Sequence, residues 1–469
     1  MSESIGFVKR YVSALALTGL IALLAVAVAC GGGSSSPLAT SANSAVQIKI
    51  GDDPDDSVLA FEITVNSVVL TDQSGATINA LSSPTTLELT HLADTNEPLS
   101  LLNVNQGTYT QAVVTVSNPK IVYINSLGQV VEKQLTLSDA VTINFSPALV
   151  VGPGSTVVNL DLNVAHSVSI NLSTGSVTLN PVFGVTTSAV PPAGQEEQEN
   201  DSDGQFEDAR GVIMSVTANS FTMSLGLSTQ TLTFNVDAST VFENIGGLAQ
   251  LSKGMLVKVN AITQANGDLL AKKVEAVEMD NASEAEGIIT AVTGNPATQL
   301  AVLDQDGVGL GMTANMLGGT LNVGITSNTT FRMPEEIDLS NLPFAPAFDA
   351  TSIRVGQRVE ADTNTGVGPS GTLSATNVEL KRQAVHGTVA NNTSTGSGQF
   401  TFTLNLPVDS YLTRLSQGAV TSILVVQQPG TELRGLSTVA NGANVRVRGV
   451  LFWTGSGFSM VARRIVAVQ

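Results

Sequence analysis

An internal repeat occupies the second half of this chain and limits what the chain can fold into. Three segments show four landmarks in the same order: a Gly followed by two apolar or β-branched residues, a Gly-x-x-Val run, a Gly-bearing turn and an Ala-x-x-(Val/Ile) run. The segments begin at Gly211, Gly287 and Gly387, and the second holds a Pro-rich insertion, Met333–Ala350. Such self-similarity indicates tandem copies of one small domain. We place the copies at residues 209–280, 281–383 and 384–469.

The composition favours β-strands. Charged residues make up 13% of the chain and aromatic residues 4%, while Gly, Ser, Thr, Val and Asn are abundant. Long helices favour Ala, Leu, Glu, Lys and Arg, whereas Thr and Val at alternating positions favour strands. The sequence therefore predicts an all-β fold.

Residues 45–188, which precede the repeats, are expected to form an N-terminal β-sandwich. Phe61, Ile63 and Val65 alternate with polar residues, as in a half-buried strand. Asn125–Gly128 separates two strand-like runs and is typical of a hairpin turn in which Gly takes a positive φ. About eight short runs at this spacing indicate a sandwich.

The N-terminal segment has the layout of an export signal. Lys9 and Arg10 precede an apolar run, Tyr11–Val28, and the single cysteine, Cys30, follows small residues. We assign residues 1–29 to a signal peptide and residues 30–44, rich in Gly and Ser, to a flexible tether. The alternative is an uncleaved transmembrane anchor, because the run approaches the ~20 residues needed to cross a bilayer.

Ala27–Cys30 resembles the lipobox of bacterial lipoproteins, although Leu is usual where Ala27 stands. The resemblance implies that Cys30 is acylated, with chains such as palmitate, and becomes the new N-terminus. Gly31 after the cysteine fits the outer-membrane sorting rule of Gram-negative lipoproteins. We therefore expect an exported protein that is lipid-anchored to the outer membrane and faces the periplasm or the cell surface.

Both folded regions resemble bacterial domains of unknown function. The first region shares short motifs with a lipoprotein domain: an Asp-rich turn after Ile48–Ile50, Gly107–Gln111, and a Pro-Val ending at Pro181. The repeats share their starting Gly and their Gly-x-x-Val run with a small, roughly five-stranded barrel that is often found in tandem. These resemblances imply a sandwich followed by three tandem OB-like barrels, and they imply no activity.

The charge distribution makes nucleic acid an unexpected partner. Without residues 1–29 the chain has 19 basic and 38 acidic residues, and an acidic exported chain is poorly suited to bind phosphates. Residues 189–208 form an acidic linker. The last repeat is the exception, with six Arg against two acids.

Arg446, Arg448 and Trp453 are the candidate binding residues in that last repeat. OB barrels bind nucleic-acid strands with such side chains. The simpler interpretation is a polar outer face beside the core residues Val445 and Val447. A third interpretation is docking to the acidic linker or to an anionic envelope polymer.

Two acidic clusters are candidate metal sites, and Ca²⁺ is the one cofactor considered. Calcium prefers carboxylate oxygens at turns. A solvated turn or linker explains both clusters as well, because neither has the spacing of a known calcium loop. The three histidines do not form a zinc set by spacing. The candidate ligands are Asp52, Asp53, Asp55, Asp201 and Asp203.

The predicted function is a structural or binding role in the envelope, with the membrane contacted through Cys30 and an envelope protein or polymer as partner. No Gly-x-Ser-x-Gly motif is present, and the single cysteine is expected to be acylated. We therefore predict that the chain is not an enzyme. The alternatives are a carbohydrate-binding or Ca²⁺-dependent adhesion protein, and a hydrolase with its site in the first domain.

Overall fold

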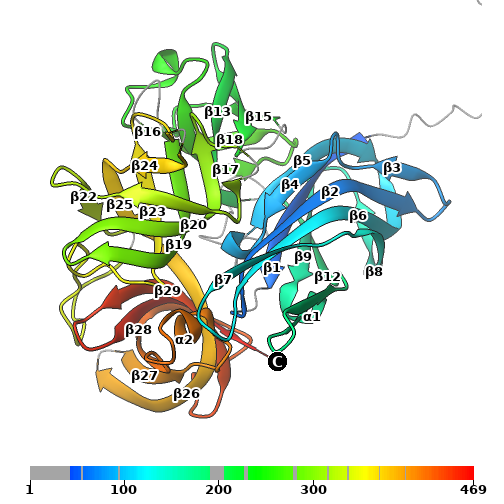
Figure 1. Cartoon of the computed structure of the whole chain (residues 1–469). Coiled ribbons are helices and arrows are strands. Elements are labelled where there is room, and N and C mark those ends of the chain that lie inside the picture. The colour runs from blue at the N-terminus through cyan, green and yellow to red at the C-terminus, as the bar shows by residue number, and fades with distance from the viewer. Residues whose placement is uncertain are drawn as a thin grey trace, which may run out of the picture. The chain divides into compact units, whose positions relative to one another are not determined.

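The computed structural model describes residues 43–53, 56–92, 96–190, 205–226, 231–277, 283–313, 316–334, 337–368, 370–396 and 398–468 (Figure 1). Nearly all of the regular structure is β-strand, so the predicted all-β class is confirmed. The helical segments are short: η1 (Thr90–Leu92), α1 (Val164–Ser167), η2 (Leu248–Gln250) and α2 (Tyr411–Leu415). Within these ranges no helix combines the length and the apolar character needed to span a bilayer.

The N-terminal region is a sandwich of two sheets around one apolar core. One sheet has the order β12-β9-β1-β5, with β9 parallel to β1. The other has the order β3-β2-β6-β7, with β4 also pairing with β2 and β8 with β6, while β10 and β11 form a separate hairpin. The bounds are β1 Asn43–Asp53, β2 Val58–Asp72, β3 Thr77–Asn79, β4 Thr85–Glu88, β5 Asn96–Asn105, β6 Gly107–Ile124, β7 Val130–Gln134, β8 Ser138–Val151, β9 Thr156–Asn163, β10 Val168–Asn171, β11 Ser176–Leu179 and β12 Phe183–Ala189.

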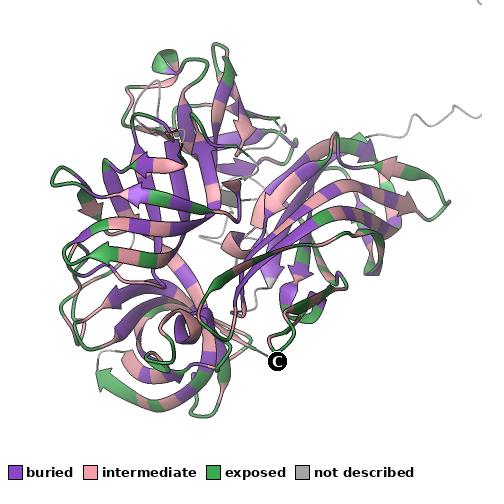
Figure 2. Ribbon diagram, in the orientation of Figure 1, coloured by how far each residue is buried: buried purple, intermediate pink, exposed green. Residues whose placement is uncertain are grey.

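The period-two patterns of the sequence explain the strands of this sandwich. Buried and partly exposed bands alternate along part of β2 (Figure 2). Phe61, Ile63 and Val65 are fully buried, whereas the residues between them are partly exposed. Gly128 has φ 74° in the turn between β6 and β7, a conformation that favours Gly. One face of each sheet thus fills the core and the other stays partly polar.

Three further units follow, and all share one strand-pairing scheme. In the first unit β13 pairs with β14 and β17, β14 with β15, and β17 with β18, all antiparallel; β15 and β16 pair with β18 in parallel. The second unit repeats these pairings with its last strand split into β24 and β25, and the third is a closed five-stranded barrel, β26-β27-β28-β30-β29. The bounds are β13 Gln205–Val216, β14 Ser220–Leu225, β15 Thr231–Asn235, β16 Val241–Glu243, β17 Leu256–Thr263 and β18 Leu269–Ala276; β19 Ser283–Gly294, β20 Ala297–Gly309, β21 Thr320–Gly324, β22 Thr330–Arg332, β23 Arg358–Thr363, β24 Thr372–Ser374 and β25 Asn377–Leu380; β26 Arg382–Gly396, β27 Gln399–Asn405, β28 Ser422–Arg434, β29 Asn444–Trp453 and β30 Phe458–Ala467.

The Gly that starts each repeat lies where the first two strands of its unit approach closely. A Cβ added to Gly211, Gly287 or Gly387 would lie 1.8, 1.7 or 2.3 Å, respectively, from a backbone carbonyl oxygen of the partner strand. No side chain fits at such a distance, so the three positions require Gly. This close approach gives the repeated Gly of the sequence a physical cause.

Residues 43–469 form one compact unit, in which the sandwich and the three later units share contacts. Leu59 and Ile124 of the sandwich belong to the same apolar cluster as Val447 of the third unit. Phe452 of the third unit packs into the core of the second unit and lies against Phe344. Polar contacts complete these junctions, and one set of ion pairs borders a charged cavity.

Candidate functional site

A row of four carboxylates crosses the second unit. Asp306 on β20 lies opposite Glu286 on β19, Glu286 opposite Glu360 on β23, and Glu360 opposite Glu379 on β25. Residues that face each other in antiparallel strands project from the same face of the sheet, and like charges in such pairs are destabilising. Glu284 and Asp362 form a second acidic pair next to this row. This face of the sheet therefore needs cations to neutralise it.

The first unit supplies two of these cations from a matching cross-strand pair. Arg210 on β13 lies directly opposite Lys258 on β17. Arg210 contacts carboxylates of the second unit through all of its nitrogens, with Nε 2.8 Å from Glu284 Oε1 and Nη2 2.8 Å from Glu360 Oε2. Its other two partners are Glu286 and Asp306. Its side chain is only 4% exposed, so these ion pairs are screened little by solvent.

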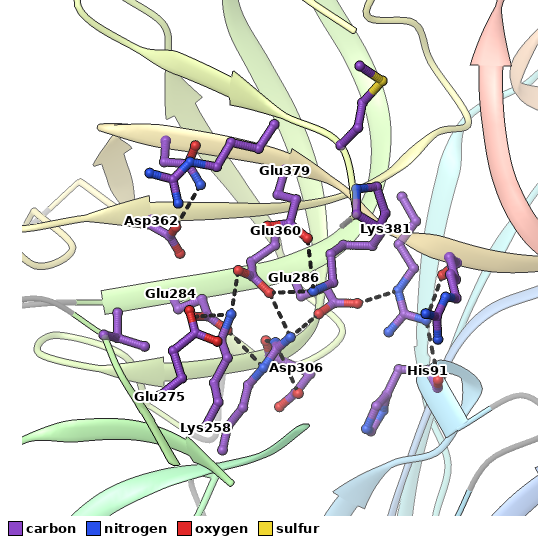
Figure 3. A pocket seen from close by; sticks show the side chains of 18 of the residues that line it. His91, Lys258, Glu275, Glu284, Glu286, Asp306, Glu360, Asp362, Glu379 and Lys381 are labelled. Carbon is purple, nitrogen blue, oxygen red and sulfur yellow. Dashed lines mark hydrogen bonds and ion pairs between the residues drawn. The ribbon is translucent and has the colours of Figure 1, made fainter. Parts of the chain in front are cut away.

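Lys258 lies between two carboxylates of the second unit, as Figure 3 shows, with Nζ 3.1 Å from Glu284 Oε2 and 2.5 Å from Glu360 Oε1. The second unit adds cations of its own. Arg358 Nε lies 2.9 Å from Glu286 Oε1, and Lys381 Nζ lies 3.0 Å from Glu360 Oε2. We call these eight side chains the junction cluster: Arg210, Lys258, Glu284, Glu286, Asp306, Arg358, Glu360 and Lys381.

The charges of the junction cluster lower the pKa of two of its glutamates, Glu286 and Glu360, but the pKa of a third, Glu284, is raised. Burial opposes the ionisation of Glu286 and Glu360, but the surrounding Arg and Lys side chains hold the pKa of both well below its ordinary value. Glu284 differs, because burial together with Glu360 and Asp362 outweighs Arg210 and Lys258 and raises its pKa to about 8. Burial lowers the pKa of Arg210 and Lys258, yet the carboxylates keep it above the ordinary value of each.

The raised pKa of Glu284 predicts a specific pH dependence of stability. An unfolded Glu loses its proton near pH 4.5, whereas Glu284 in the folded chain keeps it up to about pH 8. Between these values unfolding releases a proton, so rising pH favours the unfolded state. We expect the free energy of unfolding of the wild type to fall, relative to a Glu284→Gln variant, between pH 5 and pH 8. Urea denaturation at a series of pH values measures this difference, and parallel curves for the two proteins would refute it.

A cavity of about 930 Å³ opens beside the junction cluster. Side chains of every region contribute to its walls: His91 and Glu97 from the sandwich, Arg210 from the first unit, Glu360 from the second and Arg448 from the third. Most of the lining is polar or charged. The cavity is thus large enough for a small polar molecule or for part of a polymer.

His91, on the short helix η1, is held between two glutamates at this cavity. Its Nδ1 lies 3.2 Å from Glu88 Oε2 and its Nε2 lies 3.1 Å from Glu97 Oε1. Burial opposes a charge on the ring, but Glu97 and Glu88 outweigh burial and raise the pKa of His91 to about 10. Its carbonyl oxygen also accepts a hydrogen bond from Arg358 Nη1. His91 therefore links the sandwich to the junction cluster.

Two groups of ligand atoms in the described ranges have the spacing of a metal site. One comprises His91, Glu97 and Asp306; the other comprises Glu284, Glu360 and Asp362. Lys258 contacts Glu284 and Glu360 of the second group, so a cation there would have to displace the ammonium group. The first group offers the better set of donors.

Of the acidic residues proposed from the sequence as calcium ligands, the structure describes Asp52 and the backbone of Asp53, and neither lines the cavity. Asp52 is buried near the end of β1, opposite Leu162 of β9, and the backbone of Asp53 pairs with Asn163. Their neighbour Asp56 accepts a hydrogen bond from the backbone N–H of His386 and lies 3.0 Å from His386 Nδ1. Asp55, Asp201, Asp203 and the predicted lipidation site Cys30 lie outside the described residues.

The candidate binding residues of the last repeat lie on β29. Val445 and Val447 face the core of the third unit, as expected, so Arg446 and Arg448 project from its outer face. Arg446 is only 8% exposed, and Arg448 borders the cavity. Trp453 is half-buried, with the guanidinium of Arg354 5.2 Å from its ring centroid and Phe458 edge-on against it. Trp453 is thus largely covered and lies apart from the cavity lining.

Equivalent positions of the three repeats supply the charged pairs, and this signal was present in the sequence. The residue before the starting Gly is Arg210, Glu286 or His386, and the residue after the Val of the Gly-x-x-Val run is Lys258, Glu360 or Arg446. The structure pairs each of the first set with its counterpart in the second. The first unit thus presents two cations and the second unit presents two anions.

Comparison with known proteins gives one local family match. The family described as "Domain of unknown function (DUF5666)" matches residues 210–275, which correspond closely to the first unit. The sequence analysis gave a resemblance to a small barrel of unknown function for all three repeats, and this match falls on the first of them. No curated protein matches the chain.

Two solved structures illustrate the structural matches. "Drosophila Unr CSD456" is 12% identical, and the match covers 56% of this chain and 97% of that one, with a TM-score of 0.12. A multidomain protein with nucleic acid binding domains from Streptococcus pneumoniae TIGR4 is 13% identical, and the match covers 54% of this chain and 72% of that one, also with a TM-score of 0.12.

Proposed function

We propose that this chain is an exported envelope lipoprotein with a structural or binding role, anchored through Cys30. The small residues before Cys30 and the Gly- and Ser-rich stretch after it support an acylated tether. In this proposal the lipid holds the chain at the outer membrane, and the folded units are presented to the periplasm or the cell surface.

We further propose that the three units after the sandwich are tandem copies of one OB-like barrel. Their common pairing scheme supports this, as does the Gly at the same close approach in each unit. Duplicated copies would begin with similar outer faces. In this chain those faces carry charges of opposite sign in the first two copies, so that the copies attract each other.

The junction cluster is the main structural support for the proposed role. Its buried cations and carboxylates come from two successive units and lie in ion-pair contact with one another, while the carbonyl oxygen of His91 joins the sandwich to the same network through Arg358. Such an arrangement supports units that are docked side by side with a charged cavity between them. We propose that the cavity and the neighbouring Arg448 bind a charged segment of an envelope polymer.

Replacing Cys30 by Ser is expected to release the protein from the membrane. The thioether carries the diacylglyceryl group, and without it the ~0.8 kcal/mol per buried methylene that anchors the acyl chains is lost. On detergent phase separation, we expect the wild type in the detergent phase and Cys30→Ser in the aqueous phase. Mass spectrometry of the wild-type N-terminal peptide should show an acylated Cys30, and a free thiol on an intact segment 1–30 would contradict the proposal.

Thermal shift measurements test the binding role. Anionic envelope polysaccharide should raise the melting temperature of the wild type, and Arg448→Gln should reduce that shift. A neutral polysaccharide of similar length serves as the control. Equal shifts with both polymers, or no shift with either, would argue against a charged ligand in the cavity.

A further inference from the structure

We propose that His91, Glu97 and Asp306 bind a divalent transition-metal ion, with Zn²⁺ the best fit. The three residues come from η1, β5 and β20, so the site joins the sandwich to the second unit. One ligand atom from each residue lies within 4.8 Å of the other two. The sequence spacing of the histidines gave no sign of this site, because only one of its ligands is a histidine.

The surroundings of His91 hold its ring in the orientation that a metal ligand needs. Glu88 is fully buried, and its Oε1 accepts hydrogen bonds from Phe61 N (2.7 Å), Thr90 N (3.0 Å) and Thr90 Oγ1 (2.7 Å). Its Oε2 accepts from His91 N at 3.1 Å and faces Nδ1 at 3.2 Å. A carboxylate bonded to one ring nitrogen typically orients a metal-bound histidine and increases its basicity.

The other ring nitrogen faces the remaining ligands. His91 Nε2 lies 3.1 Å from Glu97 Oε1. Two ligands that each lie about 2.0–2.1 Å from a tetrahedral Zn²⁺ are separated by about 3.3 Å, so this distance is close to that of a coordinated pair. The hydrogen bond between the two atoms occupies the position that the metal would take. Binding would replace the proton of Nε2 by the metal ion, and the proton would leave to solvent.

The donor set and the local charge select the kind of ion. One imidazole and two carboxylates suit Zn²⁺, whereas Ca²⁺ prefers oxygen ligands alone. The two carboxylates neutralise the charge of a divalent ion. Arg210 Nη1 lies 3.2 Å from Asp306 Oδ2, and Asp306 can keep this ion pair while it uses its other oxygen as a ligand.

The site is reachable and has an open coordination position. All three residues line the cavity, and the side chain of Glu97 is 31% exposed. Three protein ligands leave a fourth position of a tetrahedral ion for water or for an anionic group of a ligand in the cavity. The metal would thus place a positive charge where the cavity meets the sandwich.

Isothermal titration with Zn²⁺ tests this site, with the visible absorption of bound Co²⁺ as a second readout. The exported full-length chain carrying Cys30→Ser is used, so that no thiol competes for the metal. We expect one ion per chain and the intense visible bands of tetrahedral Co²⁺. Glu97→Gln and His91→Gln should each weaken binding at least 10-fold, and Glu88→Gln, at a positioning residue, should weaken it about 10- to 100-fold.

His166→Gln is the matched control, because His166 lies exposed on α1 beside Asn163 and is not among the residues that line the cavity. It should bind Zn²⁺ as the wild type does. Circular dichroism establishes that each variant is folded, and the partly exposed Glu97 provides a folded variant if replacement of His91 or Glu88 disrupts the chain. Absence of stoichiometric Zn²⁺ binding by the wild type, or unchanged affinity in folded Glu97→Gln, would overturn the proposal.

Discussion

Replacing Arg210 by Met is expected to lower the free energy of unfolding by about 3–5 kcal/mol. The substitution keeps an apolar stem of similar length but removes the guanidinium group that contacts four acidic side chains: Glu284, Glu286, Asp306 and Glu360. Removing one partner of a buried ion pair leaves an uncompensated charge, and the loss is typically of this size. Urea denaturation followed by far-UV circular dichroism measures it.

Arg332→Met provides the matched control for this prediction. Arg332 lines the same cavity but is exposed, so its replacement should change stability by no more than about 0.5 kcal/mol. Adding Glu286→Gln to Arg210→Met should recover part of the loss, because one of the unpaired carboxylates is then neutral. Equal stabilities of Arg210→Met and Arg332→Met would show that the junction cluster does not hold the units together.

Gly287→Ala is expected to cost about 3 kcal/mol, at the upper end of what overpacking usually costs. The added Cβ would lie 1.7 Å from the backbone oxygen of Leu303 and 2.7 Å from the carbonyl carbon of the same residue. Backbone atoms of a paired strand cannot rotate away as a side chain can, so β19 and β20 must separate. Thermal unfolding should show a lower melting temperature for the variant.

Gly324→Ala is the control for Gly287→Ala, because Gly324 belongs to the same sheet. There the nearest atom to an added Cβ is Leu373 O at 3.8 Å, an ordinary contact distance. We expect a change within about 1 kcal/mol for this variant. A Gly287→Ala protein as stable as Gly324→Ala would mean that the close approach of the strands is easily relieved.

The sequence was sufficient to predict the class of fold and many of its strands. The alternation at Phe61, Ile63 and Val65 is a property of neighbouring residues, and so is the Gly-bearing turn at Gly128. The start of each repeat was also visible, because the Gly needed at a close strand approach recurs at the same place. These features depend on local patterns, which a single sequence displays directly.

The junction cluster was missed because it depends on pairings between distant residues. Glu286 and Glu360 are far apart in the sequence and carry like charges, so neither predicts the other. Their neutralisation by Arg210 requires the packing of two separate units. The sequence did show a charged or titratable residue beside each repeat's Gly and Val landmarks. Comparing the signs of those charges between copies would have suggested attraction between the first and the second.

The coupling energy between Lys258 of the first unit and Glu360 of the second tests most directly whether buried ion pairs dock these units. These two side chains meet at 2.5 Å and are 11% and 2% exposed. A double-mutant cycle with Lys258→Met and Glu360→Gln isolates their interaction from other effects of each substitution. If buried ion pairs dock the units, the coupling is expected to be about 2 kcal/mol. Strictly additive effects of the two substitutions, with a coupling below about 0.5 kcal/mol, would show that this ion pair does not dock the units.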